Sequence, residues 1–71
     1  MNAIEIENHI SAALAPNRAV VRSIDHGECF GIRIMSPAGE ALLELESIPR
    51  ESVTTMQQLL ILIQQLKGQL E

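Results

Sequence analysis

The chain has very few aromatic residues and only one cysteine. Its 71 residues include one Phe and neither Trp nor Tyr, although 46% of them are hydrophobic. Any core must therefore be built from aliphatic side chains, with Phe30 as its one ring. The single cysteine, Cys29, cannot form a disulfide within the chain. The covalent staple that stabilises many small domains is thus excluded.

Basic residues are also scarce. The chain has 5 Lys and Arg against 9 Asp and Glu, which gives a formal net charge of −4. Contacts between basic side chains and phosphates supply most non-specific affinity for nucleic acids, and a net negative chain opposes that attraction. We therefore expect no nucleic-acid partner.

Long apolar runs are missing as well. The longest one, residues 59–63, is far shorter than the roughly 20 residues that a membrane-spanning helix requires. The first five residues contain no basic region leading into an apolar stretch, as a secretory signal would. We expect a cytoplasmic protein that does not bind membranes, and its length predicts a single small domain over residues 1–71.

The amino-terminal segment has the pattern of an amphipathic helix. Asn2 and Glu5 have the spacing of a capping box, in which each side chain binds a free backbone N–H group of the other residue. Apolar residues recur at helical spacing as far as Leu14. Pro16 disfavours helical geometry in the residue before it, so the helix should end there.

Three strands are predicted after this helix. Residues 19–24 are rich in β-branched side chains, and residues 29–35 alternate between apolar and other side chains. Residues 36–39 have the composition of a type I turn, and a third strand follows over residues 40–46. We expect an antiparallel meander.

The hydrophobic pattern also predicts how the last two strands pair. If Met35 lies opposite Glu40, the apolar residues of both strands share one face, whereas a slip of one residue turns one set outward. This register pairs Phe30 with Leu45, Ile32 with Leu43 and Ile34 with Ala41. The other face carries Arg33, Met35, Leu42, Glu44 and Glu46, and whether Arg33, Glu44 and Glu46 form a binding surface stays open.

A long carboxyl-terminal helix is predicted from about residue 49 to residue 69. Ser47 can cap it, Pro49 suits a first turn, and Glu51 lies near the positive end of the helix dipole. Apolar residues at alternating spacings of three and four form a packing seam. Leu60, Ile61 and Leu62 lie outside that seam. The helix is therefore apolar over much of its middle circumference.

These elements predict an α+β fold. Their order is α-β-β-β-α, a three-stranded antiparallel meander with two helices packed on one face. Over nearly the whole chain this order resembles that of the double-stranded-RNA-binding domain. That family binds phosphates through lysines at the start of its second helix, where this chain has residues 50–53, Arg-Glu-Ser-Val. The resemblance is thus one of element order, without the RNA-binding site.

Few residues are suited to catalysis or metal binding. His26 and Cys29 stand three residues apart, but His9 is the one further His or Cys, and a structural zinc site usually needs four ligands. A nucleophilic Cys–His pair would also need an activated thiol, an orienting group and a pocket. We therefore expect no catalytic residues, no cofactor, no metal and no enzymatic activity.

The apolar surplus of the last helix predicts self-association. A chain of this length buries only about 60% of its unfolded surface, so a small core struggles to offset the entropy of folding. An exposed apolar patch usually marks an interface. We expect a homodimer whose interface is formed by Met56, Leu59, Leu60, Ile61, Leu62, Ile63 and Leu66.

Two functions are compatible with these features. The first is a small non-enzymatic protein–protein interaction module that self-associates and acts by binding another protein. The second is an acidic inhibitor or decoy, of the phage or mobile-element type, that occupies a basic site on a larger target. A degenerate RNA-binding-like domain and an enzyme rank below both. The identity of the protein partner does not follow from the sequence.

Overall fold

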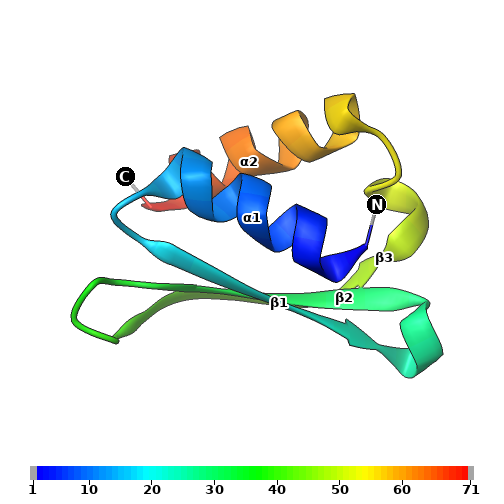
Figure 1. The fold of residues 1–71 in the computed structure, drawn as a ribbon, viewed down its shortest axis with the longest axis horizontal. Coiled ribbons are helices and arrows are strands. Elements are labelled where there is room, and N and C mark those ends of the chain that lie inside the picture. Colours follow the sequence, from blue (N-terminus) through cyan, green and yellow to red (C-terminus); the bar gives the residue numbers. More distant parts are fainter. Residues whose placement is uncertain (1, 71) are drawn as a thin grey trace.

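A computed structural model describes residues 2–70 of the chain as two layers, helices over a sheet. The elements in order are α1 (Ala3–Leu14), β1 (Arg18–Ile24), β2 (Cys29–Met35), β3 (Ala41–Pro49) and α2 (Met56–Leu70), with 3-10 turns at Asp25–Gly27 and Arg50–Ser52. Both helices lie on the same side of the sheet (Figure 1). The predicted α+β fold is confirmed.

The first helix begins as its capping residues predict. The Glu5 N–H donates to Asn2 Oδ1 at 2.8 Å, and the Asn2 N–H donates to Glu5 Oε1 at 3.4 Å. The helix ends at Leu14, two residues before Pro16. Its buried stripe consists of Ile6, Ile10 and Leu14, which face the sheet. This helix is confirmed.

The sheet is an antiparallel meander with the strand order β1-β2-β3. β1 and β2 pair without irregularity, from Arg18 opposite Met35 to Ile24 opposite Cys29. The second strand has the predicted bounds, and the first begins one residue earlier than predicted. β1 and β3 are therefore the two edge strands.

The predicted pairing of β2 with β3 is wrong by two residues from Ile32 to Ile34, by three at Cys29 and Phe30, and by one at Met35. The structure pairs Phe30 with Ile48, Ile32 with Leu45 and Ile34 with Leu43. Two bulges in β3 account for the shift, with Leu42 as the extra residue of one and Glu46 and Ser47 both opposite Gly31 in the other. Because side chains alternate with a period of two, the two-residue shift keeps the same apolar faces together.

The start of the last helix also differs from the prediction. Residues 47–49 belong to β3, and α2 begins at Met56 rather than near residue 49. A reciprocal cap explains the later start, since the Gln58 N–H donates to Thr55 Oγ1 at 3.2 Å and the Thr55 N–H donates to Gln58 Oε1 at 3.2 Å. The Thr-Met-Gln-Gln sequence of residues 55–58 carries this signal, which the sequence reading missed.

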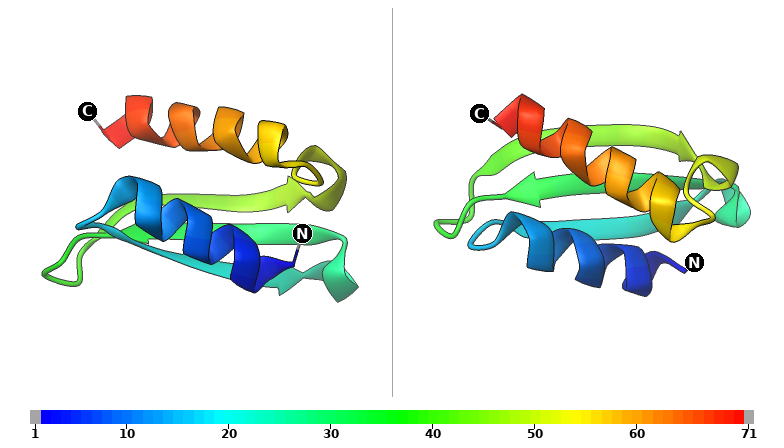
Figure 2. Two further views of the ribbon diagram at one scale, coloured as in Figure 1. Left: turned by 45° about the horizontal axis from the view of Figure 1, so that its top comes forward. Right: turned by 90° about the horizontal axis from the view of Figure 1, so that it is seen from above.

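The core lies between the helices and the sheet. α1 runs alongside β1, and α2 runs diagonally over β2 and β3 (Figure 2). No charged or polar side chain is buried within residues 2–70. The buried hydrophobic residues are Ile6, Ile10, Leu14, Ala19, Val21, Phe30, Ile32, Ile34, Val53, Leu59, Ile63 and Leu66.

Candidate functional site

The residues predicted to form a dimer interface divide into three groups by their exposure. Leu59, Ile63 and Leu66 are buried in the core, with at most 5% of their surface exposed. Leu62 is half-buried against that core. Met56, Leu60 and Ile61 are exposed by 43%, 54% and 54%. These last three residues, here called the apolar strip of α2, are therefore the part of the predicted interface that the fold leaves uncovered.

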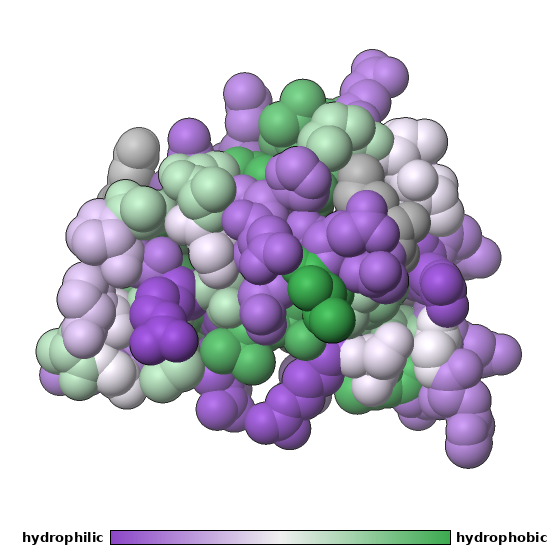
Figure 3. Space-filling view, in the orientation of Figure 1, coloured by the Kyte–Doolittle hydropathy of each residue, from purple (hydrophilic) through white to green (hydrophobic). Residues whose placement is uncertain are grey.

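The apolar strip borders a shallow hollow between α2 and the end of β3. The hollow has a volume of about 170 Å³, and its lining includes the apolar side chains of Ile48, Val53, Ile61 and Leu62. Ser52, Gln58 and Gln65 complete the lining and carry no charge. Hydrophobic surface is visible over α2 between polar side chains (Figure 3). This surface can accept an apolar side chain without burying a charge.

The opposite edge of the sheet is closed by α1. The Ala19 N–H donates to Ser11 Oγ at 3.1 Å, and the Val21 N–H donates to Glu7 Oε1 at 2.9 Å. In an antiparallel edge strand, alternate N–H groups point away from the sheet and otherwise lack a partner. Two side chains of α1 thus bind two of the outward-pointing N–H groups of β1. No pattern along the sequence indicates this contact.

β3, the other edge strand, has no such cover. The side-chain hydrogen bonds within residues 2–70 include none to an N–H group of β3. Its inward-facing residues Leu43, Leu45 and Ile48 are only half-buried, whereas Ala19 and Val21 of β1 are 5% and 8% exposed. The side of the molecule formed by α2 and β3 is therefore incompletely packed.

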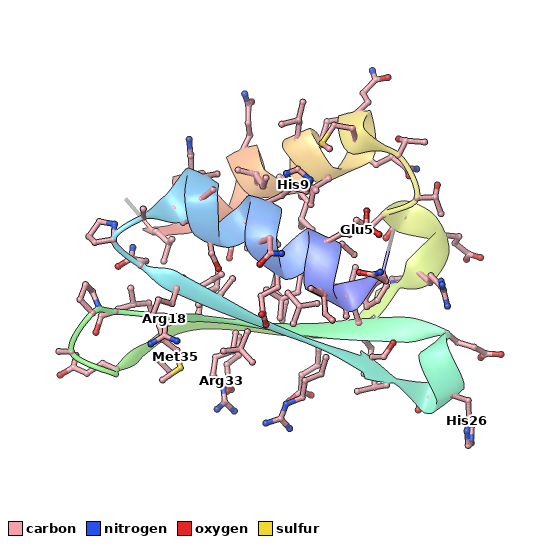
Figure 4. All side chains as sticks on the ribbon, viewed as in Figure 1. Glu5, His9, Arg18, His26, Arg33 and Met35 are labelled. Atoms are coloured by element: carbon pink, nitrogen blue, oxygen red, sulfur yellow. The ribbon has the colours of Figure 1, made fainter. Side chains whose placement is uncertain are left out.

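The sheet face turned away from the helices concentrates the basic residues of the chain. Arg18, Arg33 and Met35 project from this open face, and Arg22 belongs to the same alternating set (Figure 4). Arg33 Nε lies 2.6 Å from Glu44 Oε1, and both side chains are about half exposed. This face holds three of the 5 basic residues of the chain and two of its 9 acidic residues, Glu44 and Glu46. Its formal charge is therefore +1, and the rest of the chain has a formal charge of −5.

Cys29 and His26 line the same open hollow at one end of the sheet, where the surroundings of Cys29 disfavour its thiolate. Partial burial raises the pKa of the Cys29 thiol, and the neighbouring carboxylates of Asp25, Glu28 and Glu51 raise it further. His26 projects outward at the turn between β1 and β2, while His9 lies on α1 (Figure 4). A raised pKa works against the thiolate that nucleophilic catalysis requires.

Among residues 2–70, no three or more His, Cys, Asp or Glu side chains are grouped so as to hold a metal ion. Neither of the helices in this range has the length and hydropathy to span a membrane. The chain matches no known protein-family model, curated protein or solved structure in the comparisons.

Proposed function

We propose that this protein is a small non-enzymatic interaction module that forms a homodimer and acts by binding another protein. The apolar strip of α2 carries the proposal, because Leu60 and Ile61 each keep 54% of their surface exposed on a helix whose other side is buried. Apolar surface that the fold leaves uncovered usually marks an interface. We place the protein in the cytoplasm, in keeping with its lone unpaired cysteine.

The incomplete packing beside β3 supports self-association. Three inward-facing residues of β3 are only half-buried, and the hollow next to them is lined by Ile61 of the strip itself. Two copies related by a two-fold axis would each place the strip of one copy against the hollow of the other. Two-fold symmetry is the commonest arrangement because it lets one patch complement itself. Such a contact would bury apolar surface on both copies at once.

A second candidate function, an acidic inhibitor or decoy, is favoured by the charge of the surface outside the open sheet face. Asp25, Glu28 and Glu51 gather at one end of the molecule, where all three act on the Cys29 thiol. Apart from the open face, the chain carries a formal charge of −5. This surface is complementary to a basic site on a larger protein. The two candidates differ in which surface meets the partner.

Sedimentation equilibrium of matched variants tests the dimer. Wild type should give twice the chain mass of 7.8 kDa, and Ile61→Glu should shift the protein to monomer. Ile4→Glu is the matched control, because Ile4 is an exposed isoleucine on α1, with 69% of its surface accessible. Both variants should keep the circular dichroism of the wild type. A monomeric wild type, or an Ile61→Glu variant that stays dimeric, would contradict the proposed interface.

A further inference from the structure

The two edges of the sheet differ in how open they are to another strand. At β1, α1 lies alongside the strand, and its side chains bind the N–H groups of Ala19 and Val21 (Figure 2). At β3, no side chain within residues 2–70 accepts a hydrogen bond from a backbone N–H group. An edge with free N–H and C=O groups is a template for pairing with another chain. In this fold, β3 is the edge that offers them.

The register of the sheet identifies the free backbone groups of β3. The hydrogen bonds to α1 show that the N–H groups of Ala19 and Val21 point away from β2. Val21 lies opposite Ile32, and Ile32 lies opposite Leu45. Because inward and outward groups alternate in an antiparallel ladder, the N–H and C=O groups of Ile32 point toward Leu45, and those of Glu44 point away from the sheet. Glu44 therefore presents a donor and an acceptor at the outer edge.

The regular part of this edge is short. Residues 43–45 pair with β2 without interruption, and bulges interrupt the pairing on both sides, at Leu42 and at Glu46 and Ser47. Bulges twist an edge strand away from a partner, so pairing is confined to three residues centred on Glu44. When two such segments pair in antiparallel orientation, the two Glu44 residues lie opposite each other and exchange two hydrogen bonds.

So short an edge favours a second copy of this chain over a flexible peptide. Two backbone hydrogen bonds contribute little net free energy, and a peptide loses conformational freedom at every residue that becomes ordered. A second copy presents residues 43–45 already held in a strand, and it also brings a second α2. On the β3 side of α2, Ile61 and Leu62 line the hollow next to Ile48. The polar residues that complete this hollow carry no charge, so the two helices can bury apolar surface beside the paired edges.

The charge at the centre of the edge is balanced within each copy. Two carboxylates directly opposite each other in a strand pair are destabilising. Arg33 Nε lies 2.6 Å from Glu44 Oε1, so each carboxylate has a cation beside it in its own chain. The flanking residues Leu43 and Leu45 are apolar and half-buried. Pairing at this register therefore does not place two unpaired carboxylates at its centre.

We propose that two copies of this chain join their β3 strands edge to edge, in antiparallel orientation, about a two-fold axis at Glu44. The two three-stranded sheets become one sheet of six strands, with both pairs of helices on the same side. The α2 helix of each copy meets the α2 helix of the other across this edge contact. The inference rests on the proposed dimer and specifies how the two copies meet. Because α1 covers β1, the assembly closes at two copies.

Hydrogen exchange of single amides tests the edge contact without any substitution. The Glu44 amide should exchange about tenfold or more slowly in the dimer than after dilution to monomer. Ser23 is the matched control, because its N–H group also points outward, from β1, and binds neither Glu7 nor Ser11. Its exchange rate should not change on dilution. Fast exchange of the Glu44 amide at concentrations where the protein is dimeric would overturn the edge contact.

A proline substitution tests the same N–H group by sedimentation equilibrium. Glu44→Pro removes an outward N–H group and no hydrogen bond to β2, a position at which an edge strand tolerates proline. The variant should stay folded and dimerise about tenfold or more weakly. Glu44→Thr keeps the N–H group, suits a strand and should dimerise like wild type. A folded Glu44→Pro variant that dimerises like wild type, or equal losses in both variants, would contradict the edge contact. If Glu44→Pro does not fold, the exchange of the wild-type Glu44 amide decides.

The same measurements separate the edge contact from the proposed interface on α2. A dimer that is lost in Ile61→Glu but kept in folded Glu44→Pro would support the α2 interface and overturn the edge contact. A dimer that is lost in Glu44→Pro but kept in both Glu44→Thr and Ile61→Glu would support the edge contact and overturn the α2 interface. A monomeric wild type would overturn both.

Discussion

The two halves of this small domain close their surfaces in different ways. In the half formed by α1 and β1, Ser11 and Glu7 bind the free N–H groups of the edge strand, and the inward residues Ala19 and Val21 are buried. In the half formed by α2 and β3, the edge strand has no such cover and the apolar strip of α2 is exposed. This difference is the reason why we propose that another chain covers the α2 half.

The two halves differ in what each helix contacts apart from the core. α1 presents a buried stripe to the core and uses its flank, through Glu7 and Ser11, to cover the sheet edge. α2 also presents a buried stripe, through Leu59, Ile63 and Leu66, but its apolar strip stays exposed within the described residues. Both helices are amphipathic, but the side of α1 next to its buried stripe contacts β1, whereas the apolar strip of α2 is exposed. The uncovered face is where we expect another chain.

The largest effects are expected from truncation of one core residue in each half. Ile10 and Leu59 have no exposed surface, so Ile10→Ala and Leu59→Ala should each lower the free energy of unfolding by about 2–5 kcal/mol. Urea titrations measure both. Leu59→Ala should also weaken the dimer, because it loosens the helix that carries the strip, whereas folded Ile10→Ala should dimerise normally. A loss well below that range for Leu59→Ala would show that α2 adds little to the core.

Removing the hydrogen bond from Val21 to Glu7 should leave β1 with an uncovered edge like that of β3. Glu7→Ala deletes the acceptor of the Val21 N–H and should lower the free energy of unfolding by about 2 kcal/mol, as expected for a hydrogen bond to a charged group. Hydrogen exchange of the Val21 amide should become faster. Glu46→Ala on β3 is the matched control, with an expected change within about 0.5 kcal/mol. Equal effects of the two substitutions would argue against the cover.

Relieving the backbone strain at the β3 bulge should raise the free energy of unfolding. Ser47 has a φ of 58°, a left-handed conformation that is unfavourable for residues with a Cβ atom. Ser47→Gly should therefore raise the free energy of unfolding by about 1 kcal/mol. Ser23→Gly in the regular strand β1 should lower it by about 1 kcal/mol. Thermal melts of the two variants measure these changes, and shifts of the same sign would exclude strain at the bulge.

The smallest expected effect concerns Cys29, at the end of the sheet where both 3-10 turns lie. Because the pKa of its thiol is raised, alkylation by iodoacetamide should reach half its maximal rate at a higher pH than in the unfolded chain. The folded state holds this proton more tightly, so the associated stability is present below the unfolded pKa and is lost as the pH rises through the folded pKa. Glu28→Gln should lower the midpoint. A midpoint at or below the unfolded value would contradict this environment.

The sequence predicted the elements well and their junctions less well. The cap of Asn2 with Glu5 and the alternation along residues 29–35 are local signals, and both elements have the predicted pattern. The β3 bulges could not be predicted from alternation, because Ile48 faces inward only after Ser47 adopts a left-handed conformation. That extension of β3 moved the helix start to the cap formed by Thr55 and Gln58.

The candidate surfaces were predictable only in part. The spacing of apolar residues places Leu60, Ile61 and Leu62 off the packing seam and predicts the contact at Ile61 and Leu62 above all, and the structure leaves Leu60 and Ile61 exposed. Leu62 lies off the same seam but is half-buried, because α2 crosses the sheet at an angle that spacing alone does not define. A hollow of about 250 Å³ on the open sheet face, with Gly31 in its lining, lies beside the β3 bulge at Glu46 and Ser47. No property of the residues next to Gly31 along the chain could have shown it.

The contrast between the halves is tested most directly by NMR on a mixed dimer sample. Equal amounts of isotope-labelled and unlabelled protein are combined, and nuclear Overhauser effects between different chains are selected by isotope filtering. We predict effects between chains at the methyl groups of Leu60 and Ile61, and none at those of Ile4, the most exposed large hydrophobic residue on α1. Effects between chains at Ile4, or their absence from Leu60 and Ile61, would contradict the assignment of the dimer to the α2 half.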